Sequence, residues 1–355
     1  MAHAPIPSAL RPWRRRLLAC LVIGLGHTAV LGCGAEPGAD APTTRPTAAP
    51  ERANKPARSV ETRAKGPQTI EYYSPTVEIR KRFRSMEGPI NRQVLELAKA
   101  DPPELLWITG YRMTIVDDKG RDASQEFNCH NNFEFDAEKH AKNFGWKKTP
   151  IQRLFTLSQG QPSLALPEGF GIPLLSSEAL TVTTQALNLN HDDPNVRVRQ
   201  RVEIDIVRDE DLEEPLRPLF MVPAYIMALV EGEHGVYGVD NPDAVHEGSS
   251  CLPGVAAQAK NSPLYPDEHG KVFTGHWVVP PGREVRHTRV TSLLDLPFDT
   301  TIHFIAVHFH PFAQSLALRD LTTDETLWVA QARNREDGIG LEHVNHFSSV
   351  EGIPV

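Results

Sequence analysis

The sequence predicts an all-β protein made of many short strands. Its 355 residues include 30 prolines and 24 glycines, and these residue types form many of the turns between strands. Runs rich in β-branched and aromatic residues, such as Leu105–Val116 and Val202–Val207, lie between the turns. A chain of this length can hold two β domains of ordinary size. We expect their boundary in the acidic stretch Asp209–Pro218, so that the domains cover 67–210 and 211–355.

Residues 1–33 have the pattern of a bacterial lipoprotein signal peptide. Four arginines precede the short apolar run Leu17–Leu31, which falls below the roughly 20 residues that a membrane-spanning helix needs. The run leads into Val30-Leu31-Gly32-Cys33, which resembles a lipobox. We therefore expect Cys33 to carry a lipid, and the mature protein to be exported and anchored to the bacterial cell envelope, at the outer membrane or in the periplasm. The alternative is an ordinary signal peptide with a chance cysteine.

Residues 34–66 are expected to form a disordered N-terminal tether between this signal and the folded part. The stretch contains no aromatic residue, no leucine and no isoleucine, and alanine, proline, threonine and charged residues dominate it. Such a composition cannot bury enough apolar surface to fold. Its prolines favour a partly extended chain that holds the folded part away from the membrane.

Two cysteines remain for the folded part, Cys129 and Cys251, because Cys20 lies in the signal and Cys33 is the lipid site. Two cysteines in an exported protein suggest one disulfide between them. The alternative for Cys129 is a metal ligand beside His130, since a thiolate binds soft metal ions well.

Charge and motifs exclude several classes of function. The formal net charge is −8, and an acidic chain of this kind is a poor nucleic-acid binder. The sequence contains no glycine-rich phosphate loop, no G-x-S-x-G nucleophile elbow, no H-E-x-x-H motif and no paired C-x-x-C motif.

Short helices are expected at two places among the strands, over Arg92–Ala100 and over Ala137–Asn143. The residues Asp117–Gly120 form a turn signal that ends the strand-forming run before them.

A pair of histidines, His308 and His310, stands in the stretch Thr301–Asp320, which we expect to be an extended strand. Successive side chains of a strand point to opposite faces, so the two imidazoles project from the same side. Neutral imidazole nitrogen is a good ligand for copper, zinc and iron. The pair therefore indicates half of a transition-metal site, and the alternative is a partly buried polar pair.

Histidines elsewhere in the chain could join such chemistry. His130 lies in Phe127–Asp136, and His191 ends a predicted strand from Ala186 onward, on its apolar face. A lone histidine on an apolar face is more often a core residue than a ligand. His276 and His287, in the second half, are expected to be structural or to support a ligand.

Six motifs follow one another between Ser85 and Pro354. They are SMEGP at Ser85–Pro89, LLWITGY at Leu105–Tyr111, FNCHNNFEFD at Phe127–Asp136, LNLNH at Leu187–His191, GHWVVPPGRE at Gly275–Glu284 and AVHFHPFAQSLALRDL at Ala306–Leu321. Together they resemble the copper type II, ascorbate-dependent monooxygenases, the family of the peptidylglycine α-hydroxylating and dopamine β-hydroxylating enzymes, and especially its bacterial lipoprotein relatives. The resemblance implies two jelly-roll β-sandwich domains in tandem, each holding one copper, which face each other across an open cleft.

The resemblance also implies ligands and a reaction. His130 and His191 match ligand positions of the first copper, which supplies an electron. His308 and His310 match those of the second copper, whose third ligand in the family is a methionine. That second copper binds O2 and breaks a C–H bond of a small or peptidic substrate, with ascorbate as the usual reductant. His308 and His310 are therefore the expected catalytic residues.

The sequence departs from the family at the first copper. The animal enzymes have a histidine doublet there, whereas His130 is preceded by Cys129 and followed by Asn131. The third ligand of this copper is therefore absent from its expected place, and His140 is a weak substitute.

A second departure concerns the methionine, because no methionine follows His310. We therefore expect the chain to be truncated at its C-terminus. A third ligand from His303, His343 or His346 is conceivable.

These observations leave alternatives open. The first is an exported copper monooxygenase, and the second is a lipid-anchored copper-binding module that does not turn over because its methionine ligand is missing. The third is a structural β-sandwich lipoprotein without metal. A methionine in a longer reading frame would favour the enzyme, and its true absence would favour the binding module.

Overall fold

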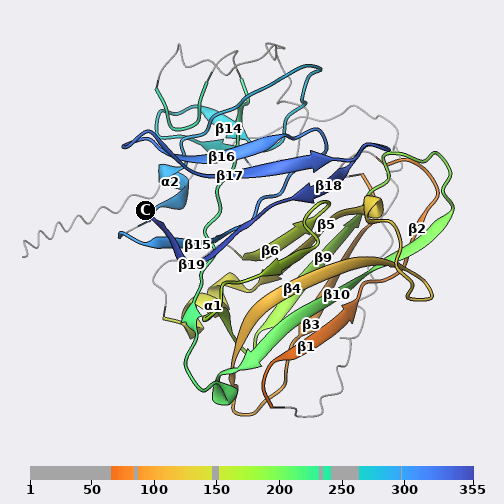
Figure 1. Cartoon of the computed structure of the whole chain (residues 1–355), viewed down its shortest axis with the longest axis vertical. Helices are drawn as coiled ribbons and strands as arrows, with labels where there is room; N and C mark the ends of the chain where they lie inside the picture. The colour runs from red at the N-terminus through yellow and green to blue at the C-terminus, as the bar shows by residue number, and fades with distance from the viewer. Residues whose placement is uncertain (1–64, 84–86, 146–151, 232–234, 241–263, 297) are drawn as a thin grey trace, which may run out of the picture. The chain divides into compact units, whose positions relative to one another are not determined.

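The computed structural model describes residues 65–83, 87–145, 152–231, 235–240, 264–296 and 298–355 (Figure 1). All of these residues belong to one compact unit, Ala53–Val355. The expected signal peptide, with Cys33, and nearly all of the expected linker lie outside the described residues. The helices of the described ranges are too short or too polar to span a bilayer.

The described residues form several mainly antiparallel sheets, which confirms the predicted β class. The largest sheet contains β1 (Gln68–Tyr73), β2 (Val77–Ile79), β4 (Leu105–Asp117), β7 (Ser163–Ala165), β8 (Phe170–Leu175), β10 (Val196–Arg208) and β11 (Arg217–Pro218). Its order is β1-β10-β4-β8-β11, with β2 paired to β10 and β7 to β4. A second sheet has the order β3-β9-β5-β6, from β3 (Ile90–Glu96), β5 (Asn128–Phe135), β6 (Arg153–Ser158) and β9 (Ala179–Ala186).

Smaller sheets follow in the second half of the chain. They have the orders β12-β14-β13, β15-β19 and β16-β17-β18. Their strands are β12 (Ala228–Leu229), β13 (Leu264–Pro266), β14 (Val272–Thr274), β15 (Thr301–Ile305), β16 (Ser315–Asp320), β17 (Glu325–Asn334), β18 (Leu341–Val344) and β19 (Phe347–Pro354). The helices of the described residues are α1 (Ala137–Asn143), α2 (Thr291–Leu294) and the short 3-10 turns η1 (Gln125–Phe127) and η2 (Asp209–Asp211).

The main hydrophobic core joins the two large sheets. In β10, buried residues alternate with more exposed ones, so that Val202 and Ile204 face the core while Arg201 does not. Tyr111 of β4 meets Phe133 of β5 edge to face, with ring centroids 4.6 Å apart. Burial of every second residue is expected in a strand whose sheet has one face covered by other parts of the protein. The core therefore fixes the position of β5, which carries His130.

Several predicted elements are confirmed, and one of the two predicted helices is wrong. The run Leu105–Val116 lies in β4, Val202–Val207 lies in β10, and the helix over Ala137–Asn143 is α1. The helix expected over 92–100 is absent, because β3 occupies its first part and pairs with β9 from Ile90 to Glu96. β3 is an edge strand whose Ile90 and Val94 are exposed, so its sequence lacks the alternation that marks a half-buried strand.

The predicted domain boundary falls where the large sheet ends. β10 ends at Arg208 and η2 follows, but β11 still pairs with β8 in the same sheet. Sheet pairing thus extends to Pro218, within the stretch where the boundary is expected. The division into 67–210 and 211–355 stays a prediction.

Gly88 packs closely against the end of β9. A Cβ at this position would overlap the backbone carbonyl oxygen of Ala186, which cannot rotate away as a side chain could. We expect Gly88→Ala to lower the free energy of unfolding by about 3 kcal/mol or more, because overpacking forces backbone shifts. Urea unfolding would measure the change. Gly275→Ala is the control, since no atom lies within 4 Å of its added Cβ, and an equal loss in both variants would contradict the prediction.

Candidate metal centre

His308 and His310 lie on the segment that joins two sheets. The expected continuous strand over 301–320 is wrong, because only β15 and β16 at its ends are strands. β15 pairs with β19, whereas β16 pairs with β17 in another sheet. The chain turns between them near Phe312, which has a positive φ of 73° and whose backbone N–H donates to Asn334 Oδ1 at 2.6 Å. The two histidines thus lie on a connection between two sheets and not on the face of a strand.

The two imidazoles nevertheless meet. His308 Nε2 and His310 Nε2 are 3.2 Å apart, and the ring centroids are 4.9 Å apart with the planes at 71°. Two nitrogens bound at about 2.0–2.1 Å to one tetrahedral ion lie about 3.3 Å from each other. The spacing therefore fits two ligands of a single metal ion.

His130 approaches this pair from β5. Its ring centroid lies 6.1 Å from that of His308, with the planes at 74°. The pairing of β5 with β9 shifts register between Asn128 and His130, so that Cys129 is the extra residue of a β-bulge. A bulge bends a strand and re-aims the neighbouring side chain. Cys129 itself is buried in β5, and Cys251 lies outside the described residues, so the disulfide stays a prediction.

Buried amides hold the bulge in place. Gln200 of β10 donates from Nε2 to Asn128 Oδ1 at 3.0 Å and to the His130 carbonyl at 3.4 Å. Asn131 Nδ2 donates to Gln200 Oε1 at 2.5 Å, and the Tyr111 hydroxyl donates to Asn131 Oδ1. Because buried polar groups are costly when unpaired, such a network specifies one arrangement of the strand.

The pKa values of the three imidazoles are all lowered. Burial, then Arg153 and His310, lower the pKa of His130 to about 4. Burial, then repulsion by His310 and His130, lower the pKa of His308 to about 3. Burial and then His276 lower the pKa of His310. Neutral rings keep the lone pairs that a metal needs.

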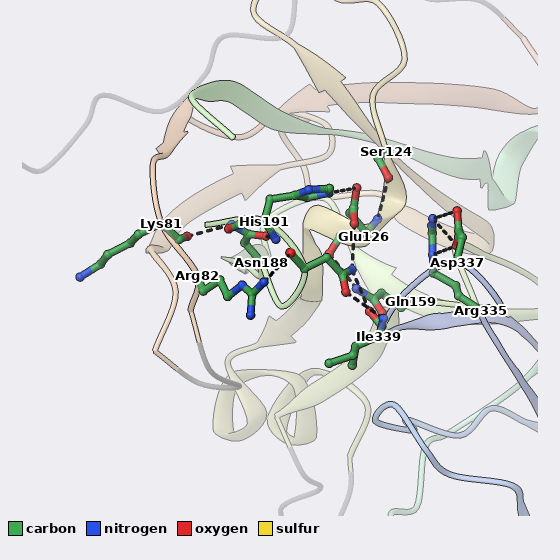
Figure 2. Close-up of polar contacts among 11 residues, drawn as sticks. Lys81, Arg82, Ser124, Glu126, Gln159, Asn188, His191, Arg335, Asp337 and Ile339 are labelled. Carbon is green, nitrogen blue, oxygen red and sulfur yellow. Dashed lines mark hydrogen bonds and ion pairs between the residues drawn. The ribbon is translucent and has the colours of Figure 1, made fainter. Parts of the chain in front are cut away.

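His191 makes contacts of its own with neighbouring polar residues (Figure 2). The expected strand through it is wrong, because β9 ends at Ala186 and His191 follows at an exposed position outside any strand. Its Nε2 is 3.2 Å from Glu126 Oε1, and its backbone N–H donates to Asn188 Oδ1 at 3.1 Å. Within the described part of the chain, the contacts of the His191 side chain are with Glu126 and the ring of Phe127, not with the other three histidines.

Other predicted ligands are engaged at a distance from the pair. His303 Nδ1 is 3.2 Å from the Ser349 carbonyl, and the His346 ring is 5.5 Å from that of Phe304. His140 is buried against Glu178, with Nδ1 2.8 Å from Oε2. Two of the described methionines also lie in hydrophobic cores: Met113 is in the main core, and Met227 is in a small core with Tyr237 and Phe273.

Two residues that act electrostatically on the histidines of the site, Arg153 and His276, were not predicted from the sequence to do so. Arg153, at the start of β6, acts electrostatically on His130 and His308, and its guanidinium is paired with Glu134 at 2.6 Å. His276, just after β14, repels His308 and His310. His276 lies in the motif at 275–284, which could have indicated a place near the site, whereas no local sequence pattern indicates such a place for Arg153.

The residues present fit a copper ion in part. His308 and His310 supply two imidazole nitrogens at a suitable spacing, and imidazole is a good copper ligand. In the described ranges, however, no three His, Cys, Asp or Glu side chains converge closely enough to hold a metal ion in this arrangement. Comparison of the chain with protein-family models and with curated proteins finds no match.

Proposed function

We propose that this protein is an exported copper-dependent monooxygenase that hydroxylates a C–H bond with O2 and a reductant such as ascorbate. The observation that carries the proposal is the 3.2 Å separation of His308 Nε2 and His310 Nε2. These two side chains are the proposed catalytic ligands. The order of motifs that resembles the copper monooxygenases supports copper over zinc or iron.

The chain's own residues would prepare the site in three ways. His308 and His310, kept neutral, would present their lone pairs to one ion. The segment that carries them is anchored by β15 on one side and β16 on the other, which limits their movement. Their exposure to solvent leaves room for a substrate. Bound copper would supply one-electron redox chemistry and a site for O2.

The overall reaction balances as follows. A substrate C–H bond, O2, two electrons and two protons give a C–OH group and one water molecule. Ascorbate supplies the two electrons, so the protein needs no organic cofactor of its own. The substrate class that the resemblance implies is a small molecule or a peptide.

The finer fold and the location belong to the same proposal. We infer that the sheets form two jelly-roll sandwiches in tandem. The first of these is supported by the two large, mainly antiparallel sheets, which share one hydrophobic core. Lipidation of Cys33 and the tether at 34–66 would place the folded part in the cell envelope.

A copper-binding module without turnover is the second candidate function. It is favoured by the positions of Met113 and Met227, whose thioethers are buried in hydrophobic cores. A soft thioether helps to stabilise Cu(I). Without one, copper would bind but cycle poorly.

Turnover with labelled dioxygen separates the two functions. The full chain, loaded with copper, would be given ascorbate and either short glycine-ended peptides or small aromatic amines as probes. We expect a product that carries one labelled oxygen atom, formed only with copper present. Ascorbate oxidation that makes only hydrogen peroxide, at the same rate with every probe, would favour the binding module. If the copper-free protein takes up oxygen at the same rate as the copper-loaded protein, both candidate functions are contradicted.

A further inference from the structure

We propose that two copies of this chain associate through β3, edge to edge, so that the sheet β3-β9-β5-β6 continues antiparallel across a two-fold axis at Val94. β3 is the last strand of that sheet in the described residues, and β9 is its neighbour. The proposed copper ligands take no part in this contact, so the association does not depend on the proposed function.

β3 lacks several features that commonly keep an edge strand from pairing with another chain. Proline, lysine and β-bulges protect many such edges. The sequence of β3, INRQVLE, contains neither proline nor lysine, and its register with β9 runs without a shift from Ile90 to Glu96. β6, at the opposite edge of the same sheet, differs, because its pairing with β5 shifts register between Phe133 and Glu134. β3 therefore offers a regular edge to a further strand.

The backbone of β3 directs every second pair of hydrogen-bonding groups away from β9. The Pro89 carbonyl accepts the backbone N–H of Ala186 at 3.0 Å. Because hydrogen-bonded pairs alternate in an antiparallel ladder, positions 91, 93 and 95 also face β9, and the N–H and C=O groups at positions 90, 92, 94 and 96 point outward. A row of outward backbone groups is a template for another strand.

The side chains at these outward positions include two exposed apolar residues. Ile90 and Val94 are 56% and 54% exposed, and they are the exposed large apolar side chains among the described strands of the two large sheets. With the axis at Val94, this side chain would pack against its own equivalent in the second copy. Removing apolar surface from water favours such an association.

Charge favours a second copy as the partner and selects the register. With the axis at Val94, Arg92 of each chain stands opposite Glu96 of the other, on the same face of the sheet as Val94. Two reciprocal ion pairs would then flank the Val94 contact, and opposite charges directly across two strands stabilise a sheet. An axis at Arg92 would instead place like charges opposite each other, which destabilises the pairing.

The present contacts of Arg92 and Glu96 allow this exchange. The Arg92 side chain is 62% exposed and lies 3.9 Å from Glu134, which Arg153 holds more closely, at 2.6 Å. The Glu96 side chain is 40% exposed and is paired with Lys99 at 2.8 Å. Exposed ion pairs contribute little to stability. Both charges can therefore turn toward another chain at small cost.

Analytical ultracentrifugation of the full chain over a range of concentrations tests the association. We expect a reversible equilibrium between monomer and dimer. Arg92→Glu should raise the Kd of the dimer at least about tenfold, because two attractive pairs become repulsive. Lys119→Glu makes the same change of charge at an exposed position in the turn after β4, and it should leave the Kd unchanged.

Mixing two variants separates a lost contact from a lost fold. Arg92→Glu carries two acidic residues at the facing positions, whereas Glu96→Arg carries two arginines there. Each variant alone should therefore dimerise poorly, and an equimolar mixture should form a dimer of one chain of each kind. Recovery on mixing requires that both variants are folded, and circular dichroism checks each of them before mixing.

An engineered disulfide tests the position of the axis. Opposed Cα atoms of a hydrogen-bonded antiparallel pair are about 5.5 Å apart, within the range that a disulfide bridges. Val94→Cys should therefore cross-link two chains under mild oxidation, beyond the level seen in the wild type. Ile90→Cys is the control, because its two copies would lie about 27 Å apart along the strands.

Three results would each overturn the proposed contact and leave the proposed function standing. They are a wild-type chain that stays monomeric at every concentration, a dimer whose Kd is unchanged by Arg92→Glu, and a mixture of the two charge variants that does not associate. A dimer in which Val94→Cys cross-links no better than Ile90→Cys would overturn the axis at Val94. Loss of copper binding or of turnover, with the dimer intact, would contradict the proposed function and not this contact.

Discussion

The double replacement of His308 and His310 by alanine is expected to reduce copper binding to none per chain. These residues supply the two nitrogens that lie 3.2 Å apart, and removing both leaves His130 as a single imidazole. Metal analysis after dialysis against a weak chelator would measure the loss. The fold should persist, because both residues are exposed and lie outside the strands.

A matched double variant makes this result specific. His343→Ala with His346→Ala removes the same number of histidines from the neighbourhood of β18, where the second residue contacts Phe304. We expect this variant to keep its copper and its affinity. If it loses as much copper as the first variant, or if the first variant keeps the wild-type stoichiometry, the assignment of His308 and His310 as ligands is wrong.

The second large effect concerns the buried pair of Glu178 and His140. Both side chains are almost completely buried, at 2% and 1% exposure, and His140 Nδ1 is 2.8 Å from Glu178 Oε2. Glu178 Oε1 also accepts the backbone N–H of Leu175 at 3.0 Å. We expect Glu178→Gln to lower the free energy of unfolding by about 2 kcal/mol near neutral pH, because hydrogen bonds to a charged group are strong and their loss leaves buried groups poorly paired.

The pH dependence of this effect follows from the pKa of Glu178. Burial raises that pKa, but hydrogen bonds from His140, the Leu175 backbone and Asn143 outweigh burial and hold it below 4.5. A carboxyl with a lowered pKa in the folded state stabilises the fold above its unfolded pKa, and that stability is lost as the pH falls through the folded pKa. The difference in the free energy of unfolding between wild type and Glu178→Gln should therefore become smaller below about pH 4.5.

Urea unfolding at several pH values would measure this difference. Glu325→Gln, at an exposed position at the start of β17, should show almost no change at any pH. A difference between wild type and Glu178→Gln that stays constant down to about pH 3 would contradict the ionic role of Glu178.

The helix α1 and the long strands could be predicted because their signals are local. α1 begins after Asp136, whose carboxylate accepts the backbone N–H of Lys139 at 3.0 Å, as an N-cap does. β10 alternates buried and partly buried residues over most of its length. β3 was missed because an edge strand with exposed Ile90 and Val94 carries no such alternation. Its conformation is set by pairing with β9, a partner distant in sequence.

The candidate site likewise has features that local sequence could predict and features that it could not. The spacing of His308 and His310 predicted that their side chains project from one face of a strand. Their imidazoles do lie close together, but on a connection between sheets and not in a strand. The approach of His130 to His308 could not be predicted, because it depends on how β5 is placed against the second half of the chain. The contact of His191 with Glu126 likewise follows from where β9 ends.

By itself, the sequence determined the β class, the principal strands and the helix α1. Each of these depends on residue periodicity, turn chemistry or spacing over a few positions. Only the tertiary structure decided that His130 lies beside His308, that a bulge braced by Gln200 carries it, and that His191 belongs to a different group of contacts. Contacts between distant residues depend on strand register and on the packing of sheets, which no short stretch of sequence encodes.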